Sequence, residues 1–146
     1  MPARPGVLLV QPASYPSRAQ DFGVPHLLAL AGWVEREAGV EPLVLDLRHE
    51  RDPDRALREA IDGSRPVVVG ISCYSSFDYL DAVETARKAR TAAPSARIVA
   101  GGYHASACPE DFTRLPDLFD HVVVGDGERA LVQSFASALN VDATRF

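Results

Sequence analysis

Residues 67–73 read VVVGISC, a run of β-branched and apolar residues that is broken only by Gly70 and followed by the small polar residues of a loop. Four further short apolar runs recur along the chain, at residues 7–11, 43–47, 97–101 and 121–125. Apolar residues at consecutive positions indicate strands that are buried on both faces, as parallel strands between two helix layers are. We therefore expect five such strands.

Helical patterns separate these runs. Apolar residues recur at three- and four-residue spacing in the intervening stretches, at residues 25–38, 53–61, 77–93, 109–115 and 128–139. Strand–helix alternation of this kind predicts an α/β fold with right-handed crossovers. The expected architecture is a flavodoxin-like (Rossmann-like), doubly wound, five-stranded parallel sheet of strand order 2-1-3-4-5, in a single domain over residues 1–146.

Composition narrows the class of protein. The 146 residues are 47% hydrophobic and 24% charged, with a net charge of −5, which argues against a nucleic-acid partner. No apolar run approaches the roughly 20 residues of a bilayer span, and the start of the chain is not a secretory signal, so we expect no membrane contact and a cytoplasmic location. Arginine supplies nearly all of the positive charge, which is typical of a GC-rich bacterial genome. Two cysteines suffice neither for a disulfide framework nor for an iron–sulfur cluster.

Ligands of open parallel sheets bind outside the carboxyl ends of the strands, so the loops that leave each strand carry the candidate site. The first loop has neither GxGxxG nor GxxxxGK[ST], which excludes a dinucleotide or P-loop phosphate site of those types. The loops after the third, fourth and fifth strands share glycines followed by small hydroxyls, which let a large flat ligand approach the backbone. The candidate cofactor-binding residues are Gln11, Pro12, Gly70, Ser72, Cys73, Tyr74, Ser75, Ser76, Gly101, Gly102, Tyr103, His104, Ala105, Ser106, Gly125, Asp126, Gly127 and Glu128.

The sequence as a whole resembles the N-terminal cobalamin (B12)-binding domain of B12-dependent radical S-adenosylmethionine (SAM) enzymes, over residues 7–139. The segments that carry the likeness are VLLVQP, PHLLALAGWVEREAG, VLDL, VVGISCYSSFD, IVAGGYHASACPE and VVVGDGE. The most specific are Gly-Gly-x-His-Ala-Ser at 101–106 and Gly-Asp-Gly-Glu at 125–128, where the family usually has Gly-Glu-Gly-Glu.

The resemblance implies that the domain holds cobalamin with its dimethylbenzimidazole tail displaced from cobalt and inserted between the sheet and a helix. By position, Gly70, Ser72, Gly101 and Gly102 are expected to line that slot. Related B12 domains place a cobalt-ligating His after the first strand, where this chain has Gln11 and Pro12. The lower face of cobalt is then left to water, to nothing, or to a residue of the third loop, with Tyr74 or Cys73 as the first candidates and Ser75 as a third.

Several single residues have more than one interpretation. His104 can be a cobalt ligand, a hydrogen-bond donor to the cofactor, or a residue that orders its loop. His26 is expected to cap or pack its helix, and Cys108 to be a buried small apolar residue. Glu128 is expected to begin the last helix, where its charge suits the helix dipole.

The resemblance also implies a catalytic domain outside this chain. The catalytic half of these enzymes binds a 4Fe–4S cluster and SAM through Cys-x-x-x-Cys-x-x-Cys, which this chain lacks. We expect no catalytic residue in the chain alone, and a radical SAM catalytic domain, in cis or in trans, belonging to a methyltransferase. Two alternatives are a B12-type domain that has lost its cofactor and serves assembly, and a flavodoxin-like domain for another flat cofactor such as FMN.

Overall fold

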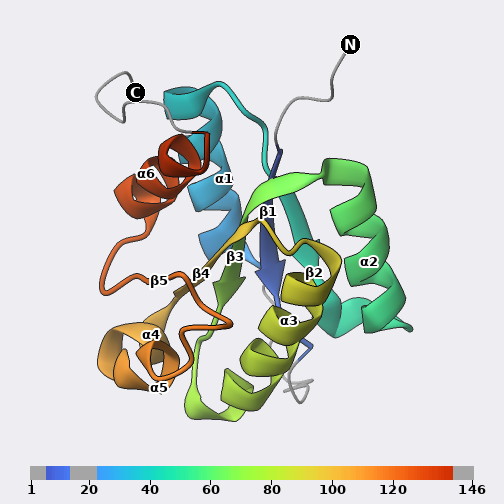
Figure 1. Ribbon diagram of the computed structural model, residues 1–146, viewed down its shortest axis with the longest axis vertical. Helices are drawn as coiled ribbons and strands as arrows, with labels where there is room; N and C mark the ends of the chain where they lie inside the picture. The colour runs from blue at the N-terminus through green and yellow to red at the C-terminus, as the bar shows by residue number, and fades with distance from the viewer. Residues whose placement is uncertain (1–5, 14–22, 140–146) are drawn as a thin grey trace.

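The computed structural model describes residues 6–13 and 23–139 and contains one parallel sheet of five strands (Figure 1). Residues 14–22 of the first loop lie outside the described part. The strand order, β2-β1-β3-β4-β5, confirms the expected doubly wound topology. The strands are β1 (Gly6–Gln11), β2 (Leu43–Asp46), β3 (Pro66–Ser72), β4 (Arg97–Gly101) and β5 (His121–Val122).

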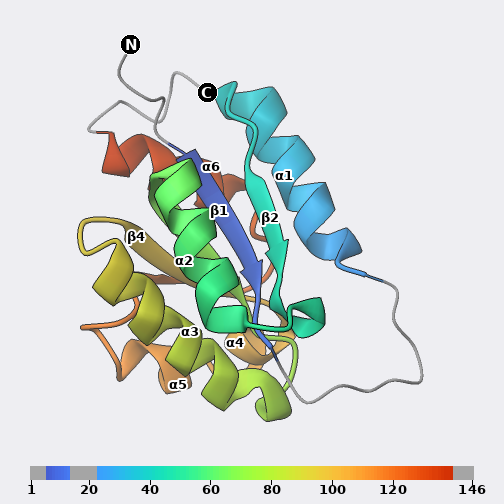
Figure 2. The same cartoon turned by 90° about the vertical axis from the view of Figure 1, so that its right-hand side faces the viewer.

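Helices cover both faces of this sheet. Helices α1 and α6 pack together on one face, whereas α2 and α3 pack against each other and against the other face (Figures 1 and 2). Each face has its own apolar core. The helices are α1 (Pro25–Ala38), α2 (Pro53–Ser64), α3 (Tyr79–Ala92), α4 (Tyr103–Ala107), α5 (Glu110–Thr113) and α6 (Glu128–Ala138), with 3₁₀ turns η1 (Leu47–His49) and η2 (Ser76–Asp78). None of the helices in these described ranges is long and apolar enough to cross a membrane.

Two segments differ from the sequence-based expectation. The expected loop after β4 contains the short helix α4, which begins immediately after Gly102. Strand β5 has two residues rather than the expected five. One more hydrogen bond, from the N–H of Val123 to the carbonyl of Ala100 (2.8 Å), follows it, and the chain then turns at Gly125, whose φ of 86° belongs to the left-handed region. Both differences lie at the carboxyl edge of the sheet, where the candidate site is expected.

A partly buried ion pair fixes the β4–β5 side of the sheet. Asp120 accepts hydrogen bonds from the backbone N–H of Ile98 (2.7 Å) and from the guanidinium of Arg90 (2.7 Å). Burial alone raises the pKa of Asp120, but these two hydrogen bonds and the charge of Arg90 outweigh it and hold the pKa below its usual value. The carboxylate therefore ties α3, β4 and the start of β5 together.

Candidate functional site

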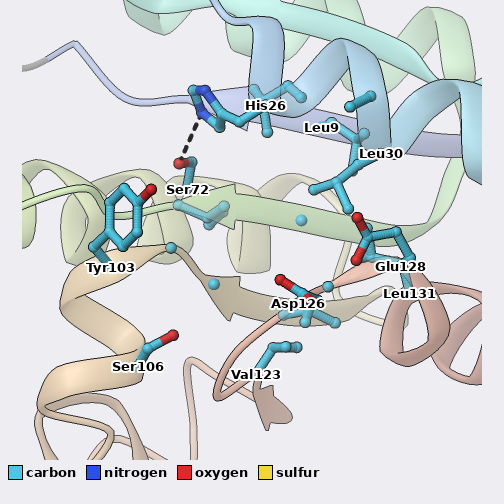
Figure 3. A pocket seen from close by; sticks show the side chains of 18 of the residues that line it. Leu9, His26, Leu30, Ser72, Tyr103, Ser106, Val123, Asp126, Glu128 and Leu131 are labelled. Atoms are coloured by element: carbon cyan, nitrogen blue, oxygen red, sulfur yellow. Dashed lines mark hydrogen bonds between the residues drawn. The ribbon is translucent and has the colours of Figure 1, made fainter.

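A cavity of about 620 Å³ lies between the carboxyl ends of β3 and β4 and the helices α1 and α6 (Figure 3). This volume is within the range of small-molecule and cofactor sites, roughly 300–1,000 Å³. The sequence-predicted residues that line it are Gly70, Ser72, Tyr74, Gly101, Gly102, Tyr103, Ser106, Gly125, Asp126, Gly127 and Glu128. The structure thus brings together residues from the loops after three different strands.

Glycines form the floor of the cavity. A Cβ on Gly70 would stand 2.9 Å from Cδ2 of Leu9 and 3.5 Å from Cδ2 of Leu131, so these two side chains already occupy the space that a side chain at position 70 would need. A Cβ on Gly101 would meet only Cβ of Val123, at 3.9 Å. The two glycines lie on neighbouring strands and both line the cavity. Gly70 lets the side chains of Leu9 and Leu131 approach the sheet, whereas Gly101 leaves an open slot above it.

Polar groups on this slot are few. Nε2 of His26, from α1, lies 3.2 Å from Oγ of Ser72, at the end of β3 (Figure 3). Burial, and then the positive charge of Arg48, lowers the pKa of His26, against a smaller opposing effect of Asp46. The ring is therefore neutral at pH 7 and interacts with Ser72 as a hydrogen-bonding group. On the α4 side, Oγ of Ser106 accepts from the N–H of Gly125 at 3.0 Å.

Two tyrosines stand at the open edge of the cavity. Tyr74, after β3, and Tyr103, the first residue of α4, are both exposed, and their rings meet edge to face with centroids 5.2 Å apart. Such pairs are stabilising beyond the area that they bury. They give this end of the cavity an aromatic rim, whereas the acidic side chains of Asp126 and Glu128 line it farther from Tyr103 (Figure 3).

Gly102 has a structural role as well as a place in the lining. Its φ is 109°, and a Cβ would stand 2.5 Å from the carbonyl oxygen of Cys73. The same carbonyl accepts from the N–H of His104 at 3.1 Å. The close approach of the β3 and β4 loops therefore requires glycine at this position.

The other sequence-predicted residues lie outside the lining. Gln11 and Pro12 are buried at the end of β1. The Cys73 side chain is buried in the core on the α2–α3 face, and burial raises the pKa of its thiol to about 12. The remaining four serve local structure: Ser75 caps η2, Ser76 begins it, Ala105 packs in the core and His104 pairs with Asp111.

Some lining residues were not among the sequence-based candidates. They are the apolar residues of the slot, together with a histidine that was expected only to cap or pack its helix: Leu9, His26, Leu27, Ala29, Leu30, Ile71, Val99, Val123 and Leu131. The signal for His26 and Leu30 was present, because residues four apart on a helix share a face.

The chemistry of this lining suits a flat heteroaromatic group. The floor includes Gly70 and Gly101, the walls are aliphatic, and Ser72 with His26 offers hydrogen bonds at one end. In the part of the chain that the structure describes, no buried side-chain polar atom lacks a partner. The glycines therefore provide shape complementarity to a ligand, and a small set of polar groups fixes the orientation of that ligand.

Comparison with known protein families finds one family that this sequence matches. Residues 16–134 match the family described as B12 binding domain. No curated protein matches the sequence. Among solved structures, the radical SAM methyltransferase TsrM from Kitasatospora setae, with cobalamin and a 4Fe–4S cluster bound, is 25% identical with a TM-score of 0.75. The alignment covers 93% of this chain and 27% of that one.

Two other solved structures share the fold. The cobalamin-dependent SAM radical enzyme OxsB, with aqua-cobalamin and SAM bound, is 17% identical with a TM-score of 0.74, over 93% of this chain and 19% of that one. A cobalamin-binding protein from Desulfitobacterium hafniense DCB-2 is 14% identical with a TM-score of 0.54, over 90% of this chain and 60% of that one. The chain thus spans about a fifth to a quarter of the length of the two radical SAM enzymes.

Proposed function

The chain belongs to the B12-binding domain family, and we propose that it binds cobalamin in the cavity between α1, α6 and the ends of β3 and β4. The observation that carries this proposal is the pair of glycines, Gly70 and Gly101, that lines the cavity between sheet and helices, with open space above Gly101. The dimethylbenzimidazole tail would occupy the slot, away from cobalt. Aliphatic side chains from β1, α1 and α6 enclose it, and Ser72 and His26 offer the hydrogen-bonding groups.

The corrin ring would then lie at the open edge, beside Tyr74 and Tyr103. When bound, cobalamin supplies a cobalt centre that carries a transferable alkyl group. The role of this chain is to hold the cofactor, to exclude water from the slot and to set which group faces cobalt.

We assign Tyr74 to the lower face of cobalt, because this side chain is exposed at the rim of the cavity. The Cys73 side chain, in contrast, is buried in the core on the opposite face of the sheet. We also propose that no protein histidine binds cobalt, since β1 ends in Gln11 followed by Pro12, and His26 is hydrogen-bonded to Ser72.

We further propose that the parent enzyme is a radical SAM methyltransferase, whose catalytic domain lies in cis or in trans. TsrM, at 25% identity, is described as such an enzyme. A second observation supports a covering domain: Phe77 and Leu80, which follow the β3 loop, are 87% and 75% exposed, and Tyr74 and Tyr103 are exposed too. These apolar side chains lie at the carboxyl edge of the sheet, where a domain that closes over the corrin would bury them.

The binding test uses the purified chain, hydroxocobalamin and, in parallel, FMN. We expect one equivalent of cobalamin to remain after desalting, with an absorption spectrum of the base-off form, and FMN to be lost. After reduction to Co(II), the electron paramagnetic resonance spectrum should lack nitrogen splitting, since neither the tail nor a histidine would be on cobalt. Retention of FMN instead of cobalamin would overturn the assignment of the cofactor, and nitrogen splitting would overturn the binding mode.

A further inference from the structure

A second group of potential ligands lies on the far side of α4 from the cavity. His104 is in α4, Cys108 caps the end of that helix, and Asp111 is in α5. Their ligand atoms (one ring nitrogen, the thiol sulfur and one carboxylate oxygen) all lie within 4.8 Å of one another. None of the three lines the cavity. We propose that these residues form a binding site for a single Zn²⁺ ion, independent of the cobalamin site.

The donor set fits zinc in chemistry. Histidine nitrogen, cysteine sulfur and aspartate oxygen are all ligands of Zn²⁺, at about 2.0–2.3 Å from the ion. A tetrahedral site with those bonds has ligand atoms roughly 3.3–3.7 Å apart. Nε2 of His104 and Oδ2 of Asp111 are 2.9 Å apart, so these two atoms must separate by less than about 1 Å. The Cys108 sulfur lies within 4.8 Å of both ligand atoms, so it must approach them by at most about 1.5 Å.

The surroundings hold the three side chains in place. The His104 ring lies against Tyr79 and Phe112, with centroids 5.6 and 5.9 Å away, and its side chain is only 11% exposed. The other carboxylate oxygen of Asp111 accepts from Arg114 at 2.9 Å, and its backbone carbonyl accepts from the Tyr79 hydroxyl at 2.7 Å. Such outer contacts orient metal ligands and limit their movement.

The local sequence supplies the three ligands within a short stretch of chain. The spacing is His-x-x-x-Cys-x-x-Asp, and the backbone N–H of Cys108 bonds the carbonyl of His104 at 2.8 Å. Asp111 is 27% exposed and Cys108 half-buried, so water can complete the tetrahedron. Three protein ligands and an open fourth position are the pattern of accessible zinc sites. Tyr103 and Ser106, which line the cavity, are also in α4. A bound ion would therefore stabilise the helix that forms this side of the cavity.

The test is a Zn²⁺ titration of the cobalamin-free chain against a chromogenic chelator, with Co²⁺ as a second probe. We expect one equivalent of Zn²⁺, a raised melting temperature, and a thiolate-to-metal charge-transfer band with Co²⁺. Cys108→Ala should lose the charge-transfer band and weaken Zn²⁺ binding at least tenfold, as should His104→Gln. The matched control is Cys73→Ala, which removes the other thiol and should keep full binding, because its raised pKa disfavours the thiolate.

Absence of stoichiometric Zn²⁺ binding by the folded wild-type chain would overturn the proposal. So would binding of equal strength in wild type and Cys108→Ala, or loss of binding in Cys73→Ala alone. Circular dichroism of each variant shows whether it is folded, and Asp111→Asn, which keeps a hydrogen-bonding side chain, gives a further variant in which Zn²⁺ binding should weaken. The outcome is separate from that of the cobalamin experiment, because no ligand of this site lines the cavity.

Discussion

Replacing Gly101 by Leu should separate cofactor binding from folding. Gly101 lies at the end of β4, and a Cβ there would meet only Val123, at an ordinary contact distance of 3.9 Å. The remaining carbons of Leu therefore enter the cavity, where the proposed tail must go. Forcing extra volume into a packed site costs about 1–3 kcal/mol. At about 1.4 kcal/mol per tenfold, the dissociation constant for cobalamin rises roughly 5- to 150-fold, whereas the unliganded protein has room for the new side chain and stays folded.

The assay is a calorimetric titration with hydroxocobalamin, paired with thermal unfolding of each variant. Gly101→Ala, whose Cβ is in ordinary contact, should lose less affinity than Gly101→Leu. Gly63→Leu is the matched control, because Gly63 lies in α2, away from the cavity lining, and a Cβ there would have no atom within 4 Å. Equal affinity of Gly101→Leu and wild type, in a folded protein, would refute the placement of the tail between Gly70 and Gly101.

Three further predictions concern the frame of the site and its rim. Gly102→Ala should lower the free energy of unfolding in urea by about 1–3 kcal/mol, because of its φ of 109° and the Cys73 carbonyl 2.5 Å away; a stability equal to that of Gly101→Ala would contradict this. Asp120→Asn should cost about 1–3 kcal/mol at pH 7. Folding lowers the pKa of Asp120, so the stability that wild type gains over Asp120→Asn is complete above the ordinary Asp pKa of about 3.9. This gain disappears as the pH falls through the lower pKa of the folded state. A difference in melting temperature that does not change with pH would refute the prediction. Tyr74→Ala should admit water to the lower face of bound cobalamin and shift its absorption spectrum and reduction potential, whereas Cys73→Ala should leave both nearly unchanged; the reverse result would mean that the loop faces the other way.

The sequence predicted the sheet and its order because buried parallel strands leave a clear run of apolar residues, as at 67–73. It did not predict α4, since five residues are too few to display a helical period. That omission also hid the pairing of His104 with Asp111, because the two meet only through the turn between α4 and α5. His26 was placed at the correct helix start, but its contact with Ser72 joins segments 46 residues apart, and no local pattern reports such a distance.

The side of the sheet that holds the cavity follows from residue size at alternate positions, because alternate side chains of a strand point to opposite faces. Toward α1 and α6, β3 presents Val68, Gly70 and then Ser72, and β4 presents Val99 and then Gly101. On this face a valine is followed in each strand by a glycine, so the side chains near the carboxyl ends are small, while the opposite face keeps Val69, Ile71 and Cys73 in a filled core. A sheet whose side chains are small at the carboxyl ends of one face leaves a cavity between that face and the helices that cover it. A large residue at Gly101 would enter this space. In the proposed binding mode it is therefore the position of the glycines, rather than any polar motif, that sets where a flat ligand enters.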